Sequence, residues 1–226
     1  METTEDFTIE KRSLAEQVYL FLCNSISSGR YKYGETISTK KLAEELHVSM
    51  MPIREALKHL EMDGIIEIRP RSMCLIRTPT KTTILSAIAV RELLEVYCVR
   101  TVYSSVRESR LTVLRNLVES MKAALAEDPL DLRKYIKYDW QFHMELCALA
   151  DNEFINKSYK ELNIHLNMNY MYDIGIKPNV SQTFRDHIDL VRALADNSPA
   201  AVDIIEKHLK ISRRNILSGE FFAAQD

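Results

Sequence analysis

Glycine is scarce in this chain: the 226 residues include only five, Gly29, Gly34, Gly64, Gly175 and Gly219. An average protein has about 7% glycine, so the chain has roughly a third of the usual supply. Sandwiches, barrels and doubly wound sheets need many tight turns and left-handed backbone positions, which glycine adopts at the least cost. Glycine-rich phosphate-binding loops are absent as well. The composition therefore predicts a mainly helical protein with few turns.

Other features that the sequence lacks exclude further classes. No apolar run approaches the ~18–20 residues of a membrane span, and the first ten residues are polar and acidic, so we expect neither a membrane protein nor a secretory signal. The net charge of -2 means that nucleic-acid binding would need a local basic patch. No C-x-x-C pair occurs, which predicts reduced thiols in a cytoplasmic protein, with the cysteines scattered at Cys23, Cys74, Cys98 and Cys147.

The segment Thr78–Thr80, with a helix-breaking proline at its centre, separates two kinds of sequence. Before it lie three of the five glycines and the one plausible strand pair, whereas long periodic stretches follow it. We therefore expect two domains, residues 1–79 and 80–226.

The first domain begins with a helical pattern in which apolar residues recur from Leu14 to Ile26. A second, short helix follows Ser38, and a third begins at Ser49, with Pro52 tolerated in its first turn. Two short strands are expected at 65–69 and 74–77. Two helices joined by a tight turn and followed by a β-hairpin predict a winged helix-turn-helix.

The segment from Ile37 to Ile66 resembles the DNA-binding domain of the GntR family of bacterial transcription regulators. The family signature V-S-x-x-P-[VI]-R-E-A-L stands at Val48–Leu57 without a gap, and L-E-x-x-G follows at Leu60–Gly64. The resemblance covers about 65 residues and implies a regulator that binds operator DNA.

The third helix would offer base edges its first residues and its solvent face. Arg54 can contact guanine or a phosphate with two hydrogen bonds, although the same charges could form an ordinary solvated face. Met50 stands where the family usually has an arginine, and Ser72 where its wing usually has a glycine, so no consensus operator is expected. The predicted DNA-binding residues are Lys40, Ser49, Met50, Met51, Arg54, Lys58, Arg69 and Arg71.

The second domain is predicted to be an all-α bundle of six helices, at about 82–106, 109–126, 129–150, 153–173, 178–196 and 199–219. Asp139 and His143 occupy inward positions of the third of these helices, where apolar residues would be expected. His187 and His208 lie on the inward stripes of the last two, at equal distances from a turn near Ser198. These side chains form either a metal site or a set of hydrogen-bonded core residues.

This domain also resembles the FCD effector domain that accompanies such winged helices. The matches are R-E-L-L-E at Arg91–Glu95, D-W-Q-F-H at Asp139–His143 and A-D-N at Ala150–Asn152, followed by His187 and His208. In that family the corresponding aspartate and three histidines bind a metal, commonly zinc, with nickel or manganese as alternatives. Six helices rather than seven indicate the VanR-like branch.

The sequence thus predicts a transcriptional regulator that is a homodimer and no enzyme. A small organic acid would bind near a metal held by Asp139, His143, His187 and His208, with Arg91 and Asn167 as effector-binding candidates. Arg91 could equally form a salt bridge with Glu95, four residues on. Two alternatives remain at this point: a direct metal sensor and a metal-dependent hydrolase.

Overall fold

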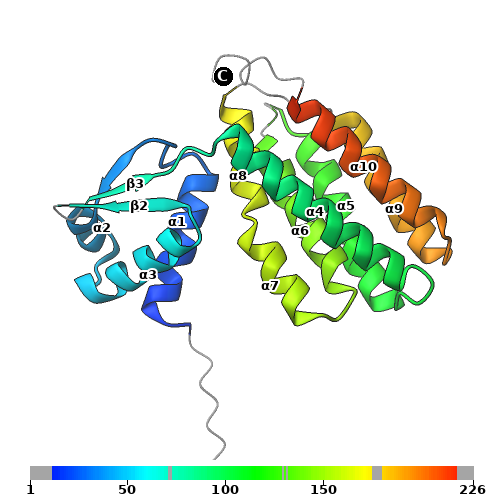
Figure 1. Ribbon diagram of the computed structural model, residues 1–226, viewed down its shortest axis with the longest axis horizontal. Helices are drawn as coiled ribbons and strands as arrows, with labels where there is room; N and C mark the ends of the chain where they lie inside the picture. The colour runs from blue at the N-terminus through cyan, green and yellow to red at the C-terminus, as the bar shows by residue number, and fades with distance from the viewer. Residues whose placement is uncertain (1–11, 71–72, 129, 131, 175–179, 218–226) are drawn as a thin grey trace, which may run out of the picture. The chain divides into compact units, whose positions relative to one another are not determined.

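The chain folds into two units, Met1–Thr78 and Pro79–Asp226, one residue from the boundary expected at 79/80. The computed structural model describes residues 12–70, 73–128, 130, 132–174 and 180–217 (Figure 1). Among these residues, no helix is long and apolar enough to cross a membrane.

The first unit is a winged helix-turn-helix. Its helices are α1 (Leu14–Ser27), α2 (Thr39–Leu46) and α3 (Met50–Met62), and its strands are β1 (Thr36–Ser38), β2 (Ile66–Arg69) and β3 (Met73–Ile76). The strands form an antiparallel sheet in the order β1-β3-β2, with Ile66 opposite Ile76 and Ile37 opposite Cys74. The sequence predicts the β2–β3 hairpin but not β1, which has too few residues to show an alternating pattern.

Polar residues begin and end these helices as their chemistry predicts. The hydroxyls of Ser13 and Ser38 accept hydrogen bonds from the backbone N–H groups of Glu16 (3.1 Å) and Lys41 (3.4 Å). His47 adopts a left-handed conformation (φ 53°) that ends α2. Ser49 has the extended backbone of an N-cap, but its side chain makes no capping hydrogen bond. The unit is held together by buried apolar residues of α1, α3 and the sheet, including Leu22, Ile26, Ile53, Leu60 and Ile76.

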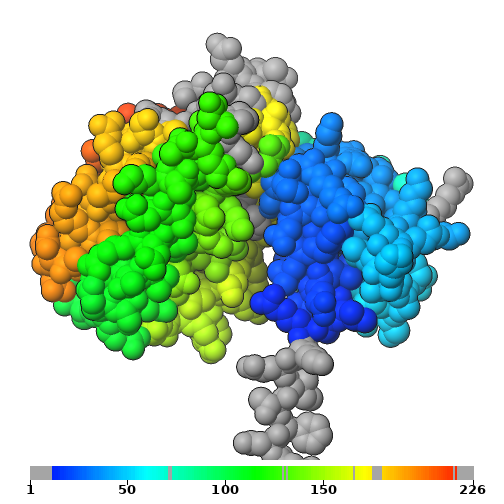
Figure 2. Space-filling view, turned by 180° about the vertical axis from the view of Figure 1, so that it is seen from behind, coloured from blue at the N-terminus to red at the C-terminus, as the bar shows by residue number. Residues whose placement is uncertain are grey.

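The second unit is a helical bundle. Its elements are α4 (Lys81–Val102), α5 (Glu108–Leu125), α6 (Leu132–Ala148), α7 (Glu153–Glu161), α8 (Ile164–Asp173), α9 (Val180–Ala195) and α10 (Ala200–Leu217). α5 packs against α6 and α9, while α10 packs against α9 and α4. Figure 2 shows the outer side of α5. Their shared core includes Leu114, Met121, Phe142, Leu194 and Ile205.

The mainly α fold class is confirmed, but the number of helices in the bundle differs from the prediction. The segment 153–173, expected as one helix, is divided into α7 and α8, so the described part of this unit has seven helices rather than six. Asn163 lies at the break in a left-handed conformation (φ 49°), which asparagine adopts more readily than most residues. The six-helix count that indicated the VanR-like branch is therefore not observed.

Candidate metal centre and nucleic-acid interface

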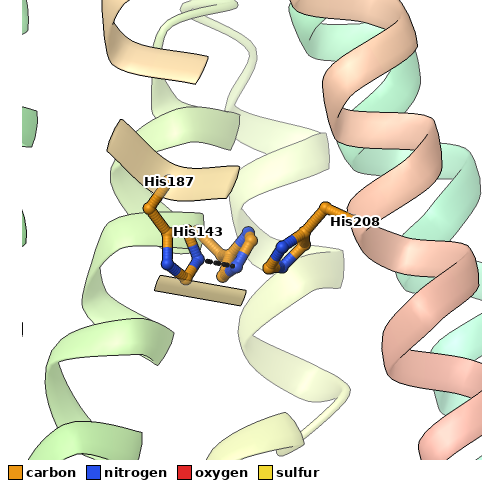
Figure 3. Close-up of side chains that lie close together, drawn as sticks. All are labelled: His143, His187 and His208. Carbon is orange, nitrogen blue, oxygen red and sulfur yellow. Dashed lines mark hydrogen bonds between the residues drawn. The ribbon is translucent and has the colours of Figure 1, made fainter. Parts of the chain in front are cut away.

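Three histidines from three helices meet inside the bundle. His143 comes from α6, His187 from α9 and His208 from α10, and each is at most 2% exposed. One nitrogen from each ring lies within 4.8 Å of the other two, and Figure 3 shows the rings turned toward one another. Among the residues that the structure describes, this is the group of histidine, cysteine and acidic side chains suited to holding a metal ion.

The α9–α10 hairpin explains why two of these histidines are level. Asn197 takes a left-handed conformation (φ 52°), and the N–H of Ala200 bonds to the hydroxyl of Ser198 at the start of α10. His187 and His208 lie at similar distances along the chain from this turn, so antiparallel helices bring them to the same height. Both continue apolar stripes, and the packing of those stripes turns the two imidazoles inward.

Asp139, the fourth predicted ligand, lies beside two of the three histidines. Its Oδ1 lies 3.3 Å from Nε2 of His187 and 3.9 Å from Nε2 of His143. The two Nε2 atoms are 3.1 Å apart. Two nitrogens that each lie ~2.1 Å from one ion, at nearly a right angle, are about 3 Å apart. The observed spacing is that of a hydrogen bond between the two rings, drawn as a dashed line in Figure 3, and it also fits neighbouring ligands on one first-row metal.

Glu95 of α4 is a member of the site that the sequence analysis misses. It is fully buried, and its Oε2 lies 2.7 Å from Nδ1 of His143. Its Oε1 accepts hydrogen bonds from Nε of Arg91 (2.6 Å) and from the hydroxyl of Tyr159 (2.7 Å). Because a carboxylate only accepts, Nδ1 of His143 carries the proton and Nε2 presents its lone pair to the cluster. The sequence signals at this residue were its four-residue spacing from Arg91 and its place in the R-E-L-L-E match.

Burial sets the charge state of the site. It lowers the pKa of His143, and Arg91 lowers it further, against the opposing effects of Glu95 and Asp139. It also lowers the pKa of His187 well below the usual value, assisted by His208 and His143. Burial alone would raise the pKa of Glu95, but Arg91 and then His143 outweigh it and lower that pKa to about 2. The two histidines are therefore neutral at pH 7, which is the form that binds metals.

Unsatisfied atoms around the cluster test whether a cation fits. Nδ1 of His187, Nδ1 of His208 and Oδ2 of Asp186 are buried without a hydrogen-bond partner. Asp186 of α9 is also buried, and its Oδ2 lies 3.7 Å from Nδ1 of His208. Three carboxylates, Glu95, Asp139 and Asp186, are buried here with one buried guanidinium, Arg91, and Lys207 also acts on Asp186. Nitrogen and oxygen donors with this charge suit a divalent transition metal.

The two effector-binding candidates lie in different surroundings. Arg91 forms the salt bridge with Glu95, but its Nη2 is buried without a hydrogen-bond partner. Burial lowers the pKa of Arg91, yet Glu95, Tyr159 and Asp139 together raise it, so the guanidinium is a permanent cation beside the cluster. Asn167 of α8 is buried and donates from Nδ2 to the carbonyl of Leu162 (3.4 Å) at the α7–α8 break.

In the first unit, the predicted DNA-binding residues lie on or beside the outer face of α3. Met51, Arg54 and Lys58 are exposed on that face, Ser49 is exposed just before it, and Met50 is partly exposed. Two other basic residues of the predicted set are paired with acids. Lys40 of α2 lies 3.9 Å from Glu44, and Arg69 at the end of β2 lies 3.2 Å from Glu67. Arg71 lies outside the described residues.

Comparisons with known families match both units. The profile of the family described as bacterial regulatory proteins, gntR family, matches residues 14–76, and the profile of the FCD domain matches residues 86–210. The second match alone covers more than half of the chain.

Curated relatives and solved structures agree with these matches. An HTH-type transcriptional regulator of Bacillus subtilis (strain 168), YdhC, is 29% identical over 160 residues, which cover 70% of this chain and 71% of that protein. The HTH-type transcriptional repressor RspR of Escherichia coli (strain K12) is 24% identical over 197 residues, covering 86% of this chain and 85% of the repressor.

The fold of McbR/YncC from E. coli superposes with a TM-score of 0.78 at 22% identity, covering 95% of this chain and 99% of that one. A GntR regulator from Rhodococcus sp. RHA1 gives the same TM-score and identity over 92% of this chain and 99% of that one. The relatives are regulators and not enzymes, and the FCD domain is one that binds metal. The chain therefore belongs to the GntR family, and it is a DNA-binding transcriptional regulator with an FCD domain.

Proposed function

We propose that this regulator binds its operator as a homodimer and responds to a small organic acid held beside a metal in the bundle. The observation that carries the proposal is the buried cluster of Asp139, His143, His187 and His208. Their spacing and the excess of buried carboxylates over buried cations around them support a resident divalent ion, with zinc first and nickel or manganese as alternatives. A bound ion supplies a Lewis-acidic position for a carboxylate oxygen.

Metal content tests the first part of the proposal. The purified protein should contain about one transition-metal ion per chain by elemental analysis, and a chelator should lower its thermal midpoint. His208→Ala should lose the ion, whereas His59→Ala, an exposed histidine of α3, should retain it. Absence of metal from protein prepared in metal-supplemented medium, together with indifference to chelator, would contradict the proposal.

Arg91 supports the acid as effector. Its Nη2 has no partner in the protein, and a guanidinium that already lies within the charged cluster can donate to an incoming carboxylate. Asn167 is the second candidate, through its side-chain amide. The test is a DNA-binding titration in which metal and organic acids are varied separately. If metal alone changes operator affinity and acids do not, the protein is a direct metal sensor and the proposal fails.

The outer face of α3 is proposed to enter the major groove. Arg54 would contact a base or phosphate, Lys58 and Lys40 would contact phosphates, and Ser49, Met50 and Met51 would face the groove. Arg69 and Arg71 of the wing would contact the adjacent backbone. Arg54→Ala should abolish sequence-specific binding without changing metal content. Arg12→Ala, which removes the same charge from an exposed position before α1, should have little effect.

An exposed apolar stripe on α4 supports dimerisation. Val90, Leu93 and Tyr97 are 40%, 73% and 55% exposed, and their spacing places them on one side of the helix. Leu93 and Tyr97 also border a groove of about 480 Å³ between α4 and α10. A self-complementary contact would cover this stripe in both subunits. Leu93→Glu should give monomers by light scattering, whereas Phe154→Glu, at a 74% exposed residue of α7, should not.

A further inference from the structure

The first turn of α3 presents an apolar side chain where recognition helices usually present polar ones. Met51 is 70% exposed, and it shares the outer face of α3 with Arg54 and Lys58. A second methionine on the same helix, Met62, is 83% exposed at its last residue. The two are eleven positions apart, which places them on the same side of the helix but about 16 Å from one another.

The position of Met51 decides what it can meet in a complex. The N-terminal residues of a recognition helix contact base edges, while its later residues approach the sugar-phosphate backbone. Arg54 and Lys58 provide the positive charge that draws this face toward DNA. A methionine offers no hydrogen-bond donor and only a weak acceptor, so it can form at most weak hydrogen bonds with the polar groups of the groove.

We infer that Met51 is a specificity-determining residue that packs against the C5-methyl group of one thymine in each half-site, an inference that rests on the proposed DNA-binding function. The thymine methyl is the apolar group that base edges expose in the major groove. A guanine, cytosine or adenine at that place would lose water from its polar edge without gaining a partner. Met51 therefore favours thymine by contact and disfavours the other bases by desolvation.

The test begins with selection of operator sequences from a random duplex library by the full-length protein. In the selected duplex, each thymine is then replaced in turn by deoxyuridine, which lacks only the methyl group. One position in each half-site should lose about fourfold in affinity, as expected for exposing one buried methyl group. The other positions should change little.

Three variants complete the test. Met51→Ala should bind thymine and deoxyuridine duplexes equally, with an unchanged salt dependence because no charge is altered. Met62→Ala, the matched control, should keep the fourfold difference. Arg54→Ala should lose specific binding to both duplexes.

The outcomes separate this inference from the function on which it rests. If a sequence is selected but no thymine depends on its methyl group, or if Met51→Ala keeps the fourfold difference, the inference is wrong and DNA binding stands. If no sequence is enriched, the proposed function fails, and the inference fails with it.

Discussion

Replacing Glu95 with glutamine would remove one negative charge from the centre of the buried network while preserving the size of the side chain. Glu95 accepts hydrogen bonds from Arg91, His143 and Tyr159, each at 2.6–2.7 Å. An amide has one accepting oxygen instead of two, so at least one of these donors would lose its partner. Arg91 would remain a buried cation without its adjacent counter-ion.

The structure sets the size of the expected effect. Breaking a buried ion pair by removing one partner costs about 3–5 kcal/mol, because the other charge stays buried. Asp139 also acts on Arg91 and is retained, so we expect the lower end of this range for Glu95→Gln. Loss of the acceptor for Nδ1 of His143 should also weaken metal binding by about 10–100-fold, as for other outer-shell partners of metal-bound histidines.

Two measurements and two companion variants make this prediction decisive. Urea unfolding of chelator-treated protein, followed by circular dichroism, gives the free energy of unfolding, and competition with a chromophoric chelator gives metal affinity. Glu92→Gln, on the same helix but in a partly exposed pair with Arg213 (3.6 Å), should cost less than about 1 kcal/mol. Tyr159→Phe removes one hydrogen bond but no charge, and should cost about 1 kcal/mol.

The reasoning would be refuted if Glu95→Gln were no more destabilising than Glu92→Gln. In that case the buried charges would not be coupled as their distances indicate. If Glu95→Gln destabilised the protein but left metal affinity unchanged, Glu95 would stabilise the fold without orienting His143.

Two further predictions follow from the bundle. Burial holds the pKa of His143 and His187 below the ~6.5 of an unfolded histidine. The metal-free protein should therefore keep its stability above pH 6.5 and lose it below that pH, by up to ~1.4 kcal/mol per pH unit for each histidine. A urea midpoint that stays constant from pH 7.5 to 5.5 would contradict this. Asn163→Val should lower the free energy of unfolding by about 1–2 kcal/mol because the backbone at residue 163 is left-handed, whereas Asn163→Gly should be tolerated. Equal thermal midpoints for the two variants would exclude strain at the α7–α8 break.

Local chemistry made much of the first unit predictable. A capping serine at Ser38, a proline confined to the first turn of α3 and a glycine after that helix each have a physical meaning that does not depend on distant contacts. β1 could not be predicted in this way, because three residues become a strand only through their pairing with β3. The break at Asn163 was missed because a single asparagine does not by itself end a helix, and its backbone conformation depends on the packing around it.

The cluster of three histidines and Asp139 was predictable as a set of exceptions to an apolar pattern. Asp139, His143, His187 and His208 stood at inward positions, where an unpaired polar residue would be costly. Glu95 also lies on an inward face, but its position four residues after Arg91 suggested an ordinary salt bridge. Only the approach of α4 to α6 shows that it also orients His143. Asp186, next to His187 in sequence, likewise becomes informative only when α10 brings His208 within 3.7 Å.

The burial of the cluster favours a resident metal over a metal signal. None of the four predicted ligands is more than 9% exposed, and the ring of Phe142 packs at 4.7 Å against that of His187. An ion could therefore enter or leave only through an opening of the packed helices α6, α9 and α10. Removing it would leave more buried carboxylates than buried cations in the interior, which opposes loss of the ion. A protein that followed the free metal concentration would need donors that exchange readily. Deeply buried donors instead fit a permanent ion, and an organic acid could reach it only through a similar opening of the helices.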